Sequence, residues 1–329
     1  MPLKILVLRF SSIGDIVLTT PVLRCIKEQL PDCELHYATK KAYVSLLSAN
    51  PYIDKIHAFE EKKLPALMDA LDAEKFDFIA DLHHNLRTFL ITSHLGIPNR
   101  KFNKLNWQKW LMVKWKINKL PQQHIVDRYL KTVEPLGVKN DGKGLDHFIP
   151  ADAHVAISSL PQEFQSGYIA LVIGAMHATK KMPPVKLVEL VDRCSLPVVL
   201  IGGPDDVAAA EIIAQQARNK VYSACGKYNL QQSASLLQQS IKVYAHDTGM
   251  MHIAAALKKD VISIWGNTIP EFGMYPYIGT AYTIAQQRAD GKILEVATLS
   301  CRPCSKLGYQ SCPKGHFRCM LDIDLSGVK

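Results

Sequence analysis

Strand-like and helix-like segments alternate along almost the whole chain, and this alternation limits the fold more than any other feature. The first half has short apolar runs typical of strands at residues 3–10, 33–39, 53–59 and 76–82. Segments with helical spacing of apolar residues lie between these runs, at residues 21–30, 42–49 and 64–74. Strands that alternate with helices in this way pair in parallel, so the pattern predicts an α/β domain with a parallel sheet.

The alternation starts again after a break at residues 140–167 that is rich in Gly, Pro, Asp and Ser. The strand-like runs of the second half are residues 168–175, 197–203, 242–247 and 260–266. Its helix-like segments are residues 184–194, 205–218, 230–239 and 250–258. A chain of 329 residues also exceeds the usual size of a single core. We therefore predict two Rossmann-like, doubly wound domains, residues 1–155 and 156–329, whose strand-end loops face a shared cleft.

Asp15 follows the first strand-like run, within residues 11–19, which we expect to form a loop or an irregular turn. Thr20 is followed by a proline, which predicts that the next helix starts there with Thr20 as its N-cap. An aspartate in such a loop often caps a turn or a helix. A carboxylate at the carboxyl end of a parallel strand can also act as a general base, because ligands bind at that edge of the sheet. The small residues Ser12 and Gly14 would let a polar substrate approach closely.

A second polar motif, residues 247–252, separates a strand-like run from an apolar helical segment. Asp247, Thr248 and Gly249 stand at the expected helix start, and His252 follows one turn later. The N-terminus of a helix that follows a parallel strand binds anions through its free N–H groups and its dipole, so this motif suits a diphosphate. The alternative is an ordinary helix cap followed by packing of the helix on the sheet.

Two further strand ends carry polar residues. Thr179 and Lys180 follow the run at 168–175, and a lysine beside a helix start suits a phosphate group as a point charge. Exposed lysines on a loop are the alternative there. The glycine pair at 202–203 is followed by Asp205, which either holds ribose hydroxyls or caps its own helix.

Taken together and in this order, four segments resemble the signatures of glycosyltransferase family 9, the ADP-heptose:lipopolysaccharide heptosyltransferases. They are RFSSIGDIVLTTPVLRCIK, GAMHATKKMPP, IGGPDD and HDTGMMHIAAALKKDVISIWG. The segment CRPCSKLGYQSCPKGHFRCM also resembles the cysteine-rich ending of that family. The resemblance covers almost the whole chain. It implies a GT-B fold with the acceptor in the first domain and the nucleotide sugar in the second.

The resemblance further implies an inverting transfer of a heptosyl residue from ADP-heptose to a lipopolysaccharide inner-core acceptor, with another nucleotide sugar as the alternative donor. It makes Asp15 the general base, Lys180 the contact of the diphosphate and Asp205 the contact of the ribose. No metal is then required for the transfer, because Lys180 and the helix start stabilise the departing diphosphate. The expected donor-binding residues are Ser12, Gly14, Thr179, Lys180, Asp205, Asp247, Thr248, Gly249 and His252.

Two positions depart from the family pattern. Met182 stands where the motif has a tryptophan, and Asn267 stands where a proline is common. Neither change removes a proposed catalytic group, but both leave the identity of the donor sugar undecided.

Residues 100–119 contain seven basic residues, no acidic residue and three of the four tryptophans. One interpretation is a solvated surface segment whose tryptophans pack inward. The other is a surface that meets the acidic groups of a lipid-linked saccharide at a membrane. The expected acceptor-binding residues are His84, Arg87, Arg100, Lys101 and Lys104.

The net charge of +9 favours anionic partners in general. A nucleic-acid-binding protein with a terminal zinc knuckle is therefore an alternative from another functional class. That alternative leaves the ordered strand-end motifs unexplained, so we expect no nucleic-acid partner.

Four of the eight cysteines lie close together, at Cys301, Cys304, Cys312 and Cys319. In a reducing compartment such a group suggests a metal before a disulfide. Four thiolates, or three with His316, would complete a structural zinc site. The spacing does not match a two-knuckle ribbon, so reduced thiols or a disulfide are the alternatives.

No apolar run approaches the roughly 18 to 20 residues needed to cross a bilayer. The N-terminal residues also lack the pattern of a signal peptide. We therefore expect a cytoplasmic enzyme that attaches peripherally to the inner face of the cytoplasmic membrane.

Overall fold

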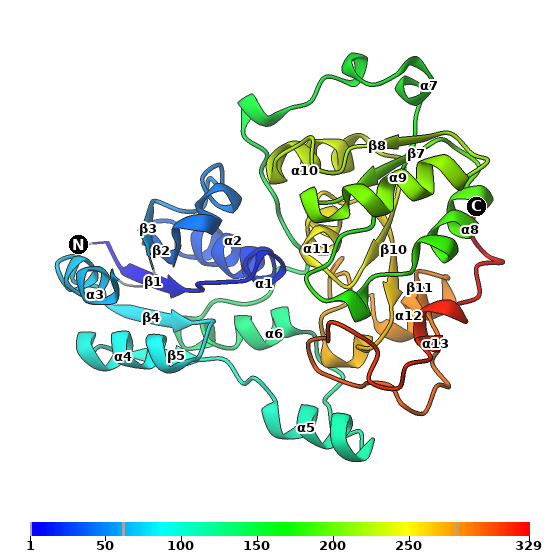
Figure 1. Cartoon of the computed structure of the whole chain (residues 1–329). Coiled ribbons are helices and arrows are strands. Elements are labelled where there is room, and N and C mark those ends of the chain that lie inside the picture. Colours follow the sequence, from blue (N-terminus) through cyan, green and yellow to red (C-terminus); the bar gives the residue numbers. More distant parts are fainter. Residues whose placement is uncertain (1, 61–62, 281) are drawn as a thin grey trace. The chain divides into compact units, whose positions relative to one another are not determined.

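The computed structural model describes residues 2–60, 63–280 and 282–329, and these form two compact units. The first unit comprises Met1–Lys104 and Gln123–Pro150, and the second comprises Leu105–Gln122 and Ala151–Lys329. Each unit is built on one parallel sheet with helices on both of its faces (Figure 1). The prediction of two doubly wound α/β domains is confirmed.

The first sheet has the strand order β3-β2-β1-β4-β5, and all its pairs are parallel. Its strands are β1 (Lys4–Leu8), β2 (Glu34–Lys40), β3 (Lys55–Phe59), β4 (Phe78–Asp81) and β5 (Asn99–Lys101). The chain runs outward from β1 to β3 and then returns to place β4 on the other side of β1. The strand order therefore reverses between β1 and β4, and ligands of doubly wound sheets bind at such a switch point.

Helices of the first unit supply the apolar side chains that cover this sheet. They are α1 (Ile13–Val17), α2 (Thr20–Gln29), α3 (Leu64–Asp72), α4 (Leu86–Leu95) and α6 (Ile125–Leu130), with 3₁₀ turns η1 (Lys41–Leu46) and η3 (Glu134–Leu136). On one face, Leu67 and Leu71 of α3 and Ile91 of α4 pack with Leu6 and Leu8 of β1 in a fully buried cluster. Such burial is the main stabilising term of the unit, at about 1.5–3 kcal/mol for each large apolar side chain.

The second sheet has the order β11-β10-β9-β6-β7-β8, again with parallel pairs throughout. Its strands are β6 (Ile169–Val172), β7 (Val198–Ile201), β8 (Val221–Ser223), β9 (Lys242–His246), β10 (Asp260–Trp265) and β11 (Ile293–Glu295). The order reverses between β6 and β9, so the second unit has its own switch point.

In the second unit, helices follow β6, β7, β8, β9 and β10 in the βα alternation that the sequence predicts. The α-helices are α5 (Asn106–Trp115), α7 (Gln162–Gln165), α8 (Pro184–Arg193), α9 (Val207–Gln216), α10 (Leu230–Gln239), α11 (Gly249–Ala256), α12 (Ile284–Ala289) and α13 (Arg318–Leu321). The 3₁₀ turns are η4 (Ala151–Ala153), η5 (Ile157–Ser159), η6 (Ala178–Lys180), η7 (Pro204–Asp206) and η8 (Pro270–Phe272).

Some local predictions are wrong. Residues 11–19 are not simply a loop or an irregular turn, because α1 occupies Ile13–Val17. The Asp15 carboxylate accepts a hydrogen bond from the Ser12 backbone N–H at 3.3 Å at the start of this helix. The next helix includes Thr20 and has Thr19 as its N-cap, and the Thr20 hydroxyl donates back to the carbonyl of Val17 at 2.8 Å. The segment at 42–49 forms the 3₁₀ turn η1 where an α-helix is predicted.

Residues 105–122, which the sequence boundary at 155 assigns to the first domain, group with the second unit. The Lys116 ammonium at the end of α5 donates to the carbonyls of Cys301 at 3.2 Å and Pro303 at 2.7 Å. The tryptophans of α5 do not pack inward. Trp107, Trp110 and Trp115 are 64%, 44% and 65% exposed, so the interpretation of this stretch as an inward-packed surface segment is wrong.

None of the helices in the described residues is both long enough and apolar enough to cross a bilayer.

Candidate active site

Asp15 lies in α1, the short helix that follows the carboxyl end of β1 at the switch point of the first sheet. Its Oδ1 lies 2.8 Å from Nη2 of Arg9, and its Oδ2 accepts a hydrogen bond from the Ser12 hydroxyl at 2.8 Å. Burial acts to lower the pKa of Arg9, but the Asp15 carboxylate acts against it and the pKa is raised overall. The guanidinium therefore stays charged and fixes the orientation of the carboxylate.

Arg9 is a site residue that the sequence analysis missed. Its Nη1 donates to the carbonyl of Leu82 at 2.6 Å and to the hydroxyl of Tyr129 at 3.0 Å, and its Nε donates to the carbonyl of Ser11 at 2.6 Å. A buried cation is tolerated only where its hydrogen bonds and its charge are satisfied. The signal in the sequence was an arginine between two apolar residues near the end of a strand-like run.

Asp81 ends β4 on the other side of the same switch point and shapes the following turn. Its Oδ1 accepts hydrogen bonds from the backbone N–H groups of His83 at 2.9 Å and His84 at 2.7 Å. Burial, and then the cations Arg9 and Lys104, lower the pKa of His83 to about 3, so this imidazole is neutral at pH 7. Its Nδ1 is buried and has no hydrogen-bond partner among the described residues.

A cavity of about 450 Å³ opens beside this turn within the first unit. Its lining residues are Asp81, His84, Asn85, Phe89, Thr92, Ser93, Asn99 and Lys101. Two of the expected acceptor-binding residues, His84 and Lys101, therefore line one cavity. Arg87, Arg100 and Lys104 are not among the residues that line it.

Lys180 and Asp247 meet at the switch point of the second sheet, after β6 and β9 respectively. The Lys180 ammonium lies 2.6 Å from Oδ2 of Asp247 and donates to the Asp247 carbonyl at 3.1 Å. The Thr268 hydroxyl donates to the same carboxylate oxygen at 2.8 Å. Thr268 follows β10 and was missed by the sequence analysis.

The helix α11 starts directly after this pair. Thr248 is its N-cap, but the Thr248 side chain makes no capping hydrogen bond, and its buried Oγ1 has no partner among the described residues. Gly249 is the first helical residue, so no side chain covers the backbone N–H groups at that point. His252 is 2% exposed and lies inside α11. An uncapped helix start beside a lysine has the charge and the donors that a diphosphate requires.

Two other expected donor-binding residues, Thr179 and Asp205, follow β6 and β7 respectively. Thr179 is 1% exposed, and its hydroxyl accepts a hydrogen bond from the Tyr309 backbone N–H at 2.8 Å, so it fastens the cysteine-rich segment. Asp205 is exposed, whereas its neighbour Asp206 is buried. Asp206 pairs with the Lys181 ammonium at 2.6 Å and accepts from the Gly203 backbone N–H at 2.9 Å.

The glycines before these turns are required by close packing. A Cβ at Gly174, after β6, would collide with Oδ2 of Asp206, and a Cβ at Gly202 would lie 2.8 Å from the Asp206 Cβ. The strand-end glycines thus make room for the buried carboxylate that shapes both turns.

Met182 and Asn267, which depart from the family pattern, are both buried. Met182 is part of the apolar core, and its backbone N–H donates to Nε2 of His246 at 3.0 Å. Burial lowers the pKa of His246 to about 4. Asn267 is 2% exposed, and neither polar atom of its side-chain amide has a hydrogen-bond partner among the described residues.

The four cysteines of the cysteine-rich segment, for which zinc, reduced thiols and a disulfide are the interpretations, are not joined in disulfides. Cys301 Sγ lies 3.9 Å from Nε2 of His316. Cys319 is buried, whereas Cys301, Cys304 and Cys312 are partly buried. Burial raises the pKa of Cys304 to about 11 and that of Cys319 to about 12, which favours neutral thiols. Across the described part of the chain, no three ligand atoms of this segment gather within 4.8 Å of one another.

Comparisons with known proteins place these features in a wider context. A family model described as glycosyltransferase family 9 (heptosyltransferase) matches residues 65–295. Lipopolysaccharide heptosyltransferase 3 of Escherichia coli K12 is 25% identical over 288 residues, which covers 78% of this chain and 80% of that protein.

Two solved structures have a similar fold. The glycosyl transferase family 9 protein from Veillonella parvula has a TM-score of 0.69 at 21% identity. The match covers 88% of this chain and 91% of the Veillonella chain. The E. coli heptosyltransferase WaaC, solved with ADP, has a TM-score of 0.64 at 20% identity. That match covers 83% of this chain and 91% of the WaaC chain.

Proposed function

Because the chain belongs to glycosyltransferase family 9 and its two Rossmann-like units make up the GT-B fold, we propose that it transfers a heptosyl residue from ADP-heptose to a lipopolysaccharide inner-core acceptor. The fold and the glycosyltransferase class agree with the sequence-based expectation. The observation that carries the choice of a nucleotide-diphosphate donor is the Lys180–Asp247 pair beside the uncapped start of α11.

The donor diphosphate binds at the start of α11 in this proposal. Its negative charge meets the Lys180 ammonium and the free N–H groups of the first helical turn. Asp247 keeps the lysine in place while the site is empty and, with Thr268, offers acceptors for sugar hydroxyls. Donors that are in position before the reaction stabilise the charge that builds on the departing ADP without reorganisation.

Asp15 acts as the general base. Its carboxylate removes the proton from an acceptor hydroxyl as the hydroxyl oxygen attacks the anomeric carbon. A new C–O bond forms on one face, the bond to the diphosphate breaks on the other, and ADP leaves with its electron pair. The configuration at the anomeric carbon is therefore inverted. A carboxylate has room for this proton even while it accepts from Arg9 and Ser12, because it offers about four lone-pair positions.

The acceptor occupies the first unit. The cavity with His84 and Lys101 in its wall supports this assignment, because inner-core saccharides carry acidic groups and Lys101 offers a cation. We assign no metal ion to the transfer, since Lys180 and α11 supply the positive charge.

A lipid-linked acceptor requires access to a membrane surface. The exposed tryptophans of α5 and the basic residues around them support peripheral attachment, because tryptophan favours the interface and lysine favours anionic headgroups. Co-sedimentation of the protein with anionic vesicles tests this, and equal binding to purely neutral vesicles would contradict the role of the lysines.

The direct test is a donor screen with the purified full chain and a heptose-free inner-core acceptor. We expect ADP release with ADP-heptose and little release with UDP- or GDP-linked sugars. Release that is as fast without acceptor would indicate hydrolysis and contradict transfer. Turnover only with another nucleotide sugar would overturn the assignment of ADP-heptose as the donor. It would still agree with the assignment of the protein as a glycosyltransferase.

A further inference from the structure

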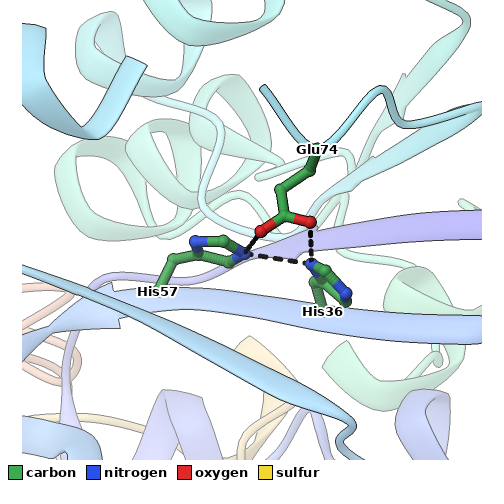
Figure 2. A group of neighbouring side chains, drawn as sticks. All are labelled: His36, His57 and Glu74. Carbon is green, nitrogen blue, oxygen red and sulfur yellow. Dashed lines mark hydrogen bonds and ion pairs between the residues drawn. The ribbon is translucent and has the colours of Figure 1, made fainter. Parts of the chain in front are cut away.

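A cluster of two histidines and a glutamate lies in the first unit, near the amino ends of its strands (Figure 2). His36 belongs to β2 and His57 to β3, and Glu74 follows α3. His36 is paired in register with Lys55, two residues before His57, so both imidazoles project from the same face of the sheet. The residues proposed for catalysis follow the opposite, carboxyl ends of the strands, so the function proposed above does not use this cluster.

The three side chains converge on one point. Nδ1 of His36 lies 3.0 Å from Nε2 of His57 and 4.0 Å from Oε2 of Glu74, and Nε2 of His57 lies 3.9 Å from Oε1 of Glu74. A tetrahedral zinc ion with bonds of about 2.0–2.1 Å holds its ligand atoms about 3.3 Å apart. Side-chain shifts of less than about 1 Å would therefore complete three of its four bonds.

Glu34 orients the first histidine. Its Oε1 lies 2.7 Å from Nε2 of His36, and a carboxylate only accepts, so Nε2 carries the hydrogen. In the neutral ring the lone pair is then on Nδ1, the atom that faces His57 and Glu74. A histidine ligand whose second nitrogen donates to a carboxylate is the usual arrangement around protein-bound metals.

The surroundings restrict water and hold the rings in place. His36 is fully buried and His57 is 7% exposed, and the Phe76 ring packs edge-on against both imidazoles. The Glu74 side chain is 16% exposed, so one side of the cluster remains open to an entering ion.

Two lysines compete for the glutamate. Lys55 forms an ion pair with it, and the Lys4 ammonium lies 3.7 Å from Oε2. The Lys55 side chain is 55% exposed, and exposed ion pairs contribute about 0–1 kcal/mol, so an arriving divalent ion can displace it. A bond to a divalent metal is much stronger than such a pair.

We propose that Nδ1 of His36, Nε2 of His57 and the carboxylate of Glu74 form a binding site for one divalent transition-metal ion of the zinc type, with Glu34 as the residue that positions His36. Two imidazoles and one carboxylate favour such an ion over Mg²⁺ or Ca²⁺, which prefer all-oxygen sites. The fourth position is left for water. The ion joins β2, β3 and the segment after α3, so its role is to stabilise the first unit.

The test uses Co²⁺ as a spectroscopic substitute for Zn²⁺, added to the chelator-treated full chain. We expect one Co²⁺ per chain, visible bands of a four- or five-coordinate site and no thiolate-to-metal band in the near ultraviolet. Zn²⁺ should displace the Co²⁺ and raise the melting temperature. Glu74→Gln should weaken binding by at least tenfold, and His57→Ala should abolish it.

His94→Ala is the matched control, because His94 is an exposed histidine of the same unit and should leave binding unchanged. Circular dichroism checks that each variant folds. X-ray absorption of the zinc-loaded wild type gives a readout without any substitution and should report nitrogen and oxygen ligands only. Sulfur ligation would assign the ion to the cysteine-rich segment and overturn the proposal. Absence of Co²⁺ binding, or equal binding by Glu74→Gln, would overturn it as well.

Discussion

Arg9 and Asp15 form an ion pair in which the guanidinium is the more deeply buried partner, with side-chain exposures of 9% and 20%. Arg9 is also anchored by the Leu82 carbonyl and the Tyr129 hydroxyl, which come from distant parts of the first unit. The position of the proposed base is therefore set by the core of the unit and not only by its own short helix.

Asp15→Asn should lower kcat by about 10²–10⁴-fold, which is the usual contribution of a general base. The amide keeps the shape of the side chain but cannot take the proton of the acceptor. ADP-heptose affinity, measured by calorimetry, should change little. Asp32→Asn serves as the control, because Asp32 is an exposed aspartate of the same unit. Normal turnover of Asp15→Asn would rule out the assignment of the base.

Lys180→Gln should weaken ADP binding and lower kcat by about 10²–10³-fold, because it removes a cation that faces the developing charge of the leaving group. Lys186→Gln is the matched control, since Lys186 forms its ion pair with Glu189 within α8. The two variants are compared by ADP titration and by steady-state kinetics. Equal losses of ADP affinity and of kcat in the two variants would show that the effect comes from the lower net charge and not from the position of Lys180.

Asp206→Ala should destabilise the second unit by about 2 kcal/mol, whereas Asp205→Ala should have almost no effect. Asp206 is buried and holds both Lys181 and the Gly203 backbone, and its loss leaves these donors without an acceptor. Asp205 is exposed. Thermal or urea unfolding of the two variants checks this contrast. A larger effect from Asp205→Ala would contradict the structure of this turn.

Acid should destabilise the second unit through His246. Burial lowers the pKa of this imidazole to about 4 from an ordinary value of 6.5, so the unfolded chain takes up the proton more readily than the folded chain. The resulting stability is fully present above pH 6.5 and is lost as the pH falls toward 4, by an amount on the order of 1–3 kcal/mol. Urea unfolding across this range measures it.

His246→Gln should flatten part of that pH dependence while keeping an acceptor for the Met182 N–H. The pKa of His57 and that of His83 are also lowered, to about 4 and about 3, so the wild type retains other acid-sensitive groups in the first unit. The difference between wild type and variant isolates His246. If the free energy of unfolding changed with pH equally in the wild type and in His246→Gln, His246 would not contribute to the loss of stability in acid.

The strands of the core could be predicted from the sequence, because their residues are apolar in continuous runs. Ile5, Leu6, Val7 and Leu8 are all fully buried, as both faces of a central parallel strand require. The edge strands could not be predicted in the same way. All three residues of β5 are exposed and polar, and only the pairing with β4 makes them a strand.

The site was predicted in part. Lys180 and Asp247 were recognised separately, but their 2.6 Å contact depends on β9 lying beside β6, which neither segment reveals alone. Asp205 and Asp206 are chemically alike and adjacent, so the sequence could not tell which one is buried; the turn η7 decides it. The cluster of His36, His57 and Glu74 was missed, since it arises from strand register.

The chain passes from one unit to the other after Lys104, returns after Gln122 and passes again after Pro150. Neither half can therefore be expressed as one uninterrupted polypeptide. A fragment cut at Ala151 would lack α5, and the carbonyls of Cys301 and Pro303 would lose the ammonium of Lys116. Cleavage of a single connection would also leave the two halves joined by covalent bonds through the others.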